Sequence, residues 1–133
     1  MVEIFSFKNA DFHDVKSLLI GAFSKNFNKG YNADFLDCAS SNGFVVKFEK
    51  KVIGYASIHI IEKVNRRSCL IEDVVISKEH RGKGIGKILI NHIIEFSKTK
   101  KCDKIILNSS ESNVRFYEIL GFTKNEVQMI IRN

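Results

Sequence analysis

Residues 68–96 read SCLIEDVVISKEHRGKGIGKILINHIIEF, and this stretch decides the fold. Residues 68–76 form an apolar run that is typical of a sheltered strand, interrupted by Glu72 and Asp73. After the polar loop 77–83, apolar residues recur at the spacing of an amphipathic helix: Ile85, Ile88, Leu89, Ile93 and Phe96. A strand, a loop and a helix in this order predict one βα unit of an α/β protein.

The sequence on both sides of this unit predicts further strands and helices. The predicted strands are residues 2–7, 43–49, 52–62, 68–76 and 104–107, and a last extended stretch covers 122–131. The predicted helices are one capped by Asp11 that ends near residues 26–30, a weaker one at about 33–39, one over 85–96, and a short one over 113–120 closed by Gly121. No linker or repeat divides the chain. We therefore expect one domain over residues 1–133, with a mixed α/β sheet and helices on both faces.

Composition excludes several classes of protein. The 133 residues are 44 % hydrophobic and 27 % charged, which is too apolar for an intrinsically disordered chain. The longest apolar runs are only a few residues long, far short of the roughly 18 residues that span a bilayer, so we expect no membrane segment. The first residues show no basic stretch followed by an apolar one, which a secretion signal would have.

The cysteines and histidines match no metal-binding pattern. The chain has an odd number of cysteines, which makes a poor disulfide framework, and they have no paired ligand spacing: Cys38, Cys69 and Cys102. The histidines are dispersed, and we interpret them as structural or exposed: His13, His59, His80 and His92. We therefore expect a reducing, cytoplasmic environment and no metal.

The net charge of +6, from 21 Lys and Arg against 15 Asp and Glu, indicates an anionic partner. Nucleic acid, an anionic membrane and a small anionic ligand are the three candidates. The basic residues are scattered apart from residues 98–101 and 78–87, whereas nucleic-acid binders more often show an arginine-rich stripe beside exposed aromatic residues. The pattern favours a small anion, with no nucleic-acid or membrane partner.

The segment Arg81-Gly82-Lys83-Gly84-Ile85-Gly86-Lys87 lies between the predicted strand and the helix. Alternate glycines expose consecutive backbone N–H groups, and the helix start adds the positive end of its dipole. These features predict a pyrophosphate cradle, and a flexible basic turn is the alternative. The loop is not a Walker A motif, because Ile88 follows Lys87. The loop is not a dinucleotide-binding fingerprint either, because the third glycine of that motif would fall at Lys87.

Two motifs in this half of the chain resemble the signatures of the GNAT acetyltransferases. Within residues 79–86, Arg81, Gly84 and Gly86 fill the pattern Arg/Gln-x-x-Gly-x-Gly/Ala that precedes a long helix in that family. Residues 113–122, NVRFYEILGF, resemble the second signature, in which an Asn starts a short helix that ends Phe-Tyr-x-x-x-Gly-Phe. The resemblance implies a single GNAT-like domain with a mixed, mostly antiparallel twisted sheet. It also implies an enzyme that uses acetyl-CoA as co-substrate.

The resemblance further implies which residues bind acetyl-CoA. They come from the end of the central strand, the loop, the helix start and the segment after residue 107: Val74, Val75, Ile76, Arg81, Gly82, Lys83, Gly84, Ile85, Gly86, Lys87, Asn108, Asn113 and Tyr117. The alternative for Asn113 is a helix N-cap, which fits its position equally well.

Three further segments, residues 71–75, 102–107 and 127–132, are similar to the glucosamine-6-phosphate N-acetyltransferases within this family. This closer resemblance implies an amino-sugar phosphate as acceptor, bound partly across the interface of a homodimer. The residues it implies for acceptor binding are Glu72, Asp73, Lys63, Asp103, Lys104 and Arg132. For the last four, ordinary surface charge is the alternative.

The acidic pair suits direct attack of an amine on a thioester. An amine is mostly protonated near neutral pH, so a carboxylate must take its proton, directly or through water. We assign this role to Glu72, because burial in the strand raises the pKa of a carboxyl. Asp73 points to the opposite face of a regular strand, so a bulge is needed for both to serve one ligand. An ion-paired strand edge is the alternative.

Two further groups would complete the reaction. Backbone N–H groups near residues 74–76 are predicted to receive the pantetheine arm as an added strand and to polarise the carbonyl oxygen. Tyr117, whose ordinary pKa is about 10, would return a proton to the leaving thiolate. Packing beside Phe116 is the alternative for Tyr117.

The sequence therefore predicts an acetyl-CoA-dependent N-acetyltransferase, with glucosamine 6-phosphate as the first acceptor to test. Another small amine or a protein or peptide amino group is the alternative within the same chemistry. A non-catalytic acyl-CoA-binding module and a basic nucleic-acid-binding domain are the alternatives from other classes. Glu72 and Tyr117 favour the enzyme, because a binding module needs neither a base nor an acid.

Overall fold

The structure is a computed structural model that describes residues 1–23 and 33–133. Its five strands form one sheet in the order β1 (Val2–Ser6), β2 (Ser41–Phe48), β3 (Lys51–Glu62), β4 (Arg67–Ile76) and β5 (Lys104–Leu107). The first four strands pair antiparallel, and β5 pairs parallel to β4. This confirms the predicted mixed, mostly antiparallel sheet.

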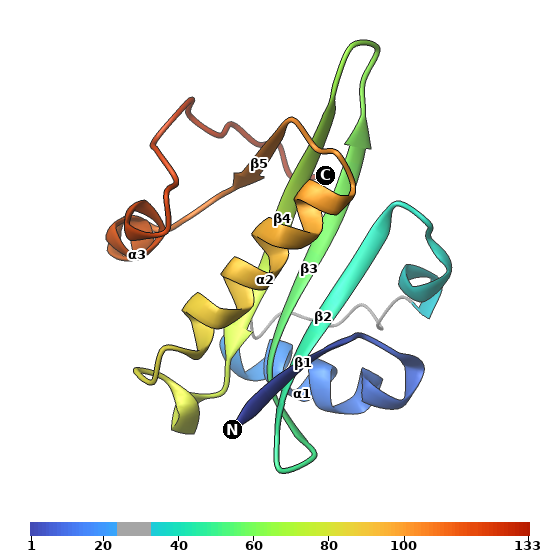
Figure 1. The fold of residues 1–133 in the computed structure, drawn as a ribbon, viewed down its shortest axis with the longest axis vertical. Helices are drawn as coiled ribbons and strands as arrows, with labels where there is room; N and C mark the ends of the chain where they lie inside the picture. Colours follow the sequence, from blue (N-terminus) through green and yellow to red (C-terminus); the bar gives the residue numbers. More distant parts are fainter. Residues whose placement is uncertain (24–32) are drawn as a thin grey trace.

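Two helices cover opposite faces of this sheet, as the sequence predicted. The first is α1 (Phe12–Ala22), which packs through Val15 and Leu19 on a group that includes Tyr55. The second is α2 (Ile85–Thr99), which crosses in front of β3 and β4 in Figure 1 and buries Ile85, Leu89, Ile90 and Ile93 on the other face. Each fully buried Leu or Ile stabilises the fold by roughly 1.5–3 kcal/mol. The core therefore fixes the central strands on both sides.

The predicted boundaries differ from the observed ones mainly at turns. The β2–β3 hairpin turns at Glu49 and Lys50, whose φ angles are 50° and 67°, so β3 resumes at Lys51. Such a two-residue turn has left-handed φ at both positions. The predicted strand bounds placed the turn at residues 50–51, so the observed turn lies one residue earlier. The weak helix predicted at 33–39 is a 3₁₀ helix, η2 (Ala33–Asp37). Helix α1 ends at Ala22, and the predicted end at 26–30 lies outside the described residues.

Asp11 does not cap α1 with its side chain as predicted. One carboxylate oxygen accepts the backbone N–H of Lys8 at 3.0 Å, and the other pairs with Lys47 Nζ at 3.0 Å. Asp11 is only 5 % exposed, so this ion pair is largely shielded from water. The carboxylate therefore ties the start of α1 to β2, where a cap would have acted only within the helix.

The C-terminal part of the chain leaves the sheet. After β5 come a 3₁₀ turn, η4 (Glu111–Asn113), and the short helix α3 (Val114–Ile119), which lies to one side of the sheet in Figure 1. The glycine that closes α3, Gly121, has a φ of 105°. The extended stretch predicted at 122–131 takes part in no strand pairing of the described residues. Phe122 packs on the core, whereas Val127, Met129, Ile130 and Ile131 face solvent.

Candidate active site

Glu72 and Asp73 lie where the pairing between β3 and β4 is interrupted. Ser57 is opposite Glu72 and Tyr55 is opposite Val75, so β4 has one more residue than β3 over this stretch. Asp73 has a φ of 53°, in the left-handed region that residues other than glycine seldom adopt. This is the β-bulge that both carboxylates require if they are to serve one ligand.

The bulge brings both acidic side chains toward the face of the sheet that α1 covers. Residues directly opposite one another share a face, and Ser57 and Tyr55 are on the α1 face, where Tyr55 packs with Val15 and Leu19 of α1. The negative charge of Asp73 contributes to raising the pKa of Tyr55, after burial as the main cause. The two carboxylates therefore belong to one polar cluster.

The surroundings of the cluster favour proton uptake by its carboxylates. Burial raises the pKa of the Glu72 carboxyl, the charge of Asp73 raises it further, and His59 acts in the opposite direction. Asp73 lies at the surface, yet the protein around its carboxyl still raises its pKa by desolvation, again opposed by His59. A carboxylate with a raised pKa is a stronger base, which suits Glu72 to take a proton from an amine.

The outer edge of β4 is open beside this cluster. The parallel ladder with β5 ends at the pair Ile71–Leu107, while β4 continues to Ile76. Figure 1 shows β5 and the chain after it turning away from β4 toward α3. On that side, no described strand pairs with residues 72–76. The backbone N–H groups of this stretch that point away from β3 are therefore free to bind an added strand-like ligand. That residues 74–76 receive one stays a prediction.

The glycine-rich loop joins this edge to α2. Gly82 and Gly84 have φ angles of 77° and 79°, and a Cβ placed at either would meet no atom within 4 Å. The glycines are therefore required by the backbone conformation, and the space in front of them is open. Gly84 is the N-cap of α2, whose first N–H groups point into this space. The loop and helix start thus have the open shape and exposed N–H groups of the predicted pyrophosphate cradle, which stays a prediction.

The cationic residues of the loop surround this cradle. Arg81, Lys83 and Lys87 are all exposed. The Arg81 Nε–H donates to the carbonyl oxygen of Ile76 at 3.0 Å, which ties the loop to the end of β4 and leaves the remaining guanidinium N–H groups for a ligand. Ile85 is buried in the core and contributes its backbone only.

Tyr117 lies on α3, which packs close to the first turn of α2. A Cβ placed on Gly86 would lie 3.3 Å from the Phe116 ring, so α3 approaches the cradle closely. The Tyr117 ring is half-buried between Phe116 and Phe122, with centroid distances of 4.9 and 5.8 Å. Burial raises the pKa of Tyr117, so its phenol keeps the proton near neutral pH. Its hydroxyl makes no hydrogen bond within residues 1–23 and 33–133 and is free for a ligand.

The two asparagines are also open to a ligand. Asn113 occupies the N-cap position of α3, but its side chain makes no capping hydrogen bond. Helix capping therefore does not account for this side chain. Asn108 directly follows the end of β5 and is exposed.

Comparison with known proteins agrees with this geometry. The model of a family described as "Acetyltransferase (GNAT) family" matches residues 12–122. The chain belongs to the GNAT acetyltransferase family. A solved structure of an acetyltransferase from Trypanosoma brucei shares this GNAT fold with a TM-score of 0.89 and 31 % identity, covering 100 % of both chains. The Arabidopsis thaliana glucosamine-6-phosphate N-acetyltransferase structure has the same fold, with a TM-score of 0.85 and 24 % identity over 99 % of this chain and 98 % of that one.

Curated relatives are similar to this chain over part of its length. A glucosamine 6-phosphate N-acetyltransferase from Trypanosoma brucei brucei is 45 % identical over 82 residues, which is 59 % of this chain and 56 % of the relative. A second, from Dictyostelium discoideum, is 39 % identical over 85 residues, or 61 % of this chain and 54 % of the relative. The chain thus spans little more than half the length of these relatives.

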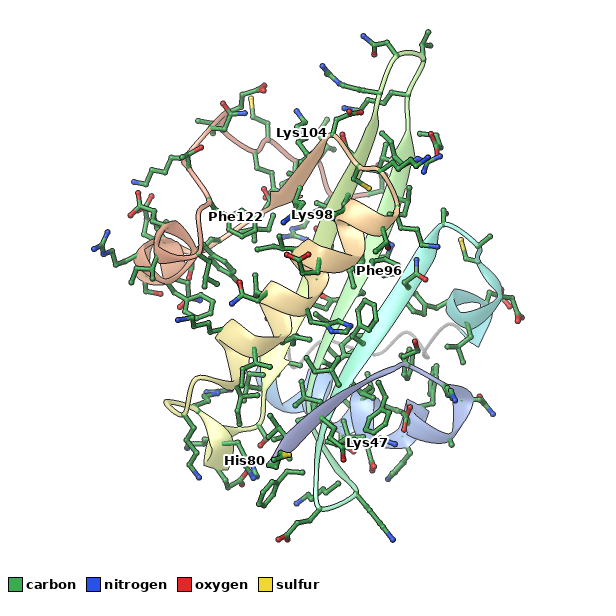
Figure 2. All side chains as sticks on the ribbon, in the orientation of Figure 1. Lys47, His80, Phe96, Lys98, Lys104 and Phe122 are labelled. Atoms are coloured by element: carbon green, nitrogen blue, oxygen red, sulfur yellow. The ribbon has the colours of Figure 1, made fainter. Side chains whose placement is uncertain are left out.

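The four residues expected to hold an acceptor phosphate lie on segments other than the acidic pair and the glycine loop. Figure 2 shows Lys104, at the start of β5, at the opposite end of the molecule from His80, which precedes the glycine loop. Asp103 lies at the same end as Lys104, and its carboxylate accepts the backbone N–H of Arg67 at 2.9 Å. Lys63 begins the turn between β3 and β4, and Arg132 is exposed near the C-terminal residue. These assignments stay predictions.

Sequence reasoning missed three polar residues beside the acidic pair. Tyr55, Ser57 and His59 alternate along β3 and share the face of Glu72. His59 had been interpreted as structural or exposed because no other histidine stands at ligand spacing, yet its charge acts on both carboxyls. The signal was present: three polar side chains at every second position of an apolar strand indicate one polar face.

Three further searches concern the rest of the molecule. Within the described residues, no group of His, Cys, Asp and Glu side chains could hold a metal ion. No helix in residues 1–23 or 33–133 is long and apolar enough to cross a membrane. A cleft of about 140 Å³ is lined by residues of β1, β2 and α2 such as Ser6, Ser41 and Phe96, and it includes neither the acidic pair nor the glycine loop.

Proposed function

We propose that this protein transfers the acetyl group of acetyl-CoA to the primary amine of glucosamine 6-phosphate. Family membership supports acetyl-CoA as the donor, and the names of the curated relatives support the acceptor. The structure supports the donor independently, because an open anion cradle lies beside an open strand edge. The observation that carries the proposal is the bulge at Asp73, which brings a proton acceptor to that same edge.

Acetyl-CoA supplies an acyl carbon activated as a thioester. Its pyrophosphate is bound by the backbone N–H groups at the start of α2 and by the cations of the loop. The backbone N–H groups of residues 74–76 bind the pantetheine arm and the carbonyl oxygen. Glu72 takes a proton from the amine, directly or through water. The nitrogen then forms the C–N bond while the C–S bond breaks, and Tyr117 gives its proton to the sulfur. The nitrogen loses its second proton, which passes through solvent back to the Tyr117 oxygen, and Glu72 releases the first proton to solvent. The products are an amide and a free thiol.

The raised pKa values of Glu72 and Tyr117 favour an enzyme over a module that only binds acyl-CoA. A binding module gains nothing from a desolvated carboxylate, because burying a charge costs free energy. Within the same chemistry, another small amine or a peptide amino group is the second candidate acceptor. The reason is that Lys104, one of the residues expected to hold a phosphate, pairs with Ser68 of β4 and not with the acidic pair.

A thiol-release assay tests this function directly. Purified protein and acetyl-CoA are offered glucosamine 6-phosphate, glucosamine, other small amines and a peptide with a free amino terminus. We expect thiol release with glucosamine 6-phosphate and much less with glucosamine, which lacks the phosphate. Release with a different amine only would refute the acceptor. If acetyl-CoA also fails to raise the melting temperature, the donor is refuted as well.

We further propose a homodimer that completes the phosphate site. Residues of the C-terminal stretch expose large apolar side chains, among them Val127 at 87 %, Met129 at 90 % and Ile131 at 90 %. Such a strip marks an interaction surface, and a second copy seated on it could bring Arg132 or Lys104 to the Glu72 of its partner. Light scattering should give twice the chain mass, and Met129→Lys should give a monomer with a higher KM for the sugar phosphate. A wild-type monomer that turns over would contradict the dimer.

A further inference from the structure

Three hydrogen bonds connect β2, β3 and the main chain of the bulge. Ser41 Oγ lies 3.0 Å from Nδ1 of His59, and Nε2 of the same ring lies 3.1 Å from Ser57 Oγ. The Ser57 hydroxyl in turn donates to the carbonyl oxygen of Glu72 at 3.2 Å. The strand register agrees with these hydrogen bonds, because Ser41 is directly opposite His59 and Ser57 is directly opposite Glu72.

The direction of each hydrogen bond follows from the number of protons available. Ser57 has one hydroxyl proton and uses it on the Glu72 carbonyl, so it must accept the Nε2–H of His59. In a neutral imidazole, Nδ1 is then bare and accepts the hydroxyl proton of Ser41. If Nδ1 gains a proton, only the Ser41 bond reverses. The link from His59 through Ser57 to the bulge is the same in both protonation states.

This link acts on the peptide unit that begins the bulge. Because a peptide unit is planar, holding the Glu72 carbonyl also sets the direction of the Asp73 N–H. Asp73 follows directly in its left-handed conformation, which a non-glycine residue keeps only when its surroundings hold it there. The Ser57 hydroxyl is a side-chain donor at the position where the regular ladder of β3 and β4 is interrupted.

The imidazole is held in place from a second side and faces the acidic pair. The Phe35 ring packs edge-on against it at a centroid distance of 5.9 Å. Among the described residues, four titratable groups surround the hydrogen bonds of Ser41, His59 and Ser57. They are Glu72 and Asp73 from β4, Tyr55 from β3, and Cys38, which hydrogen-bonds to Ser41. A proton on His59 therefore faces two carboxylates across one strand.

We propose that Ser41, His59 and Ser57 form a positioning chain that holds the Glu72–Asp73 bulge in the geometry that receives the acceptor amine. The proposal rests on the proposed acetyl transfer for its effect on turnover. His59 and Ser57 are positioning residues, because they act on the reacting groups through the main chain and charge of the bulge.

Kinetics of matched variants test the chain. Ser57→Ala and His59→Phe should lower kcat/KM for the amine about ten- to hundredfold, with the KM for acetyl-CoA changed by less than about twofold. Ser57→Thr restores the donor and His59→Gln restores both hydrogen bonds, so both should recover most of the rate. In His59→Gln, the acidic limb of the pH profile should move to higher pH, since a group that lowers the pKa of Glu72 is gone.

The control is Ser68→Ala in the regular half of β4. Ser68 lies on the same face as Ser57 and is completely buried, and within the described chain its hydroxyl has no partner. This variant should keep wild-type kinetics. A folded Ser57→Ala protein with unchanged kcat/KM, or an equal loss in Ser68→Ala, would overturn the proposal.

NMR separates failure of this proposal from failure of the proposed function. In wild-type protein, the ¹⁵N shifts of neutral His59 should show the proton on Nε2. Ser57→Ala should shift the ¹³C resonance of the Glu72 carbonyl, which loses its hydrogen bond, and leave that of Ile71 unchanged. A wild-type protein with no turnover on any amine refutes acetyl transfer. The two NMR results would still show whether the hydrogen bonds from Ser41 to Glu72 exist. A proton on Nδ1, or an unchanged resonance of the Glu72 carbonyl in Ser57→Ala, refutes the positioning chain.

Discussion

The two halves of β4 have opposite characters within ten consecutive residues. From Ser68 to Ile71 the strand is paired on both sides, and Ser68, Cys69 and Ile71 are almost completely buried. From residue 72 to 76 it is paired on one side only, contains a left-handed residue and carries two carboxylates. The regular half fixes the position of the strand, and the irregular half is where backbone groups remain available for chemistry.

Both halves depend on the same core, and this is why the irregular one is tolerated. Ile71 and Val75, on the two sides of the bulge, are 2 % and 5 % exposed and pack on opposite faces of the sheet. The bulge is therefore clamped between two buried side chains. A strained Asp73 and two carboxyls with raised pKa values persist because the packing around them supplies the stability that they lack.

The largest effect is expected when the irregular half is made regular. Deleting Asp73 removes the extra residue, so Glu72 stays opposite Ser57 and Val75 stays opposite Tyr55. The core register is kept, and we expect a folded protein. Because the left-handed turn of the edge backbone and one carboxylate are lost, turnover should fall at least about a thousandfold in the thiol-release assay.

The same deletion in the regular half gives the opposite result. Removing Ser68 shifts the rest of the strand by one residue, and side chains that faced the core would then face solvent. That variant should not fold, as circular dichroism would show. A deletion of Asp73 that is folded and fully active would mean that the bulge has no part in catalysis.

The next largest effect concerns the cradle beside the open edge. Gly84→Val puts a branched side chain into the space where the first N–H groups of α2 are exposed, and it strains a residue with a φ of 79°. We expect acetyl-CoA to lose its ability to raise the melting temperature. Gly121→Val is the matched control, because its φ of 105° imposes a comparable strain outside the cradle. Loss of the acetyl-CoA effect in both variants would attribute it to strain alone.

The parts of the site that could be predicted are those that are continuous in sequence. The glycine loop, the start of α2 and Tyr117 on α3 follow from local spacing, because each motif is built within one βα or loop–helix unit. The need for a bulge also followed from two adjacent carboxylates on a strand of period two. Its presence could not be predicted, because the register of Ser57 and Tyr55 against β4 is set by packing.

The parts that could not be predicted join residues distant in the chain. Ser41, His59 and Glu72 lie on three strands, and only the pairing of those strands brings them together. Asp11 was expected to act within its own helix but pairs with Lys47, whose position depends on the β1–β2 register. Local propensity cannot encode such partners, whereas the alternation of Tyr55, Ser57 and His59 showed that a polar face existed.

The smallest effect is expected when the bulge keeps its shape and loses one charge. Asp73→Asn leaves a residue that tolerates left-handed φ and removes the charge that helps to raise the pKa of Glu72. The pKa of Glu72 should fall, so the acidic limb of the kcat/KM profile should move to lower pH. This is opposite to the direction expected for His59→Gln.

The same substitution should also change the stability of the fold, and the raised pKa of Asp73 determines whether the change is a gain or a loss. A carboxyl whose pKa is higher in the folded state binds its proton more tightly there, so its contribution is favourable at low pH and is lost as pH rises through that pKa. At neutral pH the ionised Asp73 therefore destabilises the fold, and Asp73→Asn should raise the melting temperature. The gain should shrink as the pH falls through the raised pKa of Asp73, and it should vanish below the ordinary range of Asp, where both states of the wild type are protonated. Glu118→Gln, at an exposed site on α3, is the control and should show neither the gain nor its pH dependence. A gain that is the same at all pH values would show that the substitution acts by relieving backbone strain and not by removing a charge. Strain, and not charge, would then be the main difference between the two halves of β4.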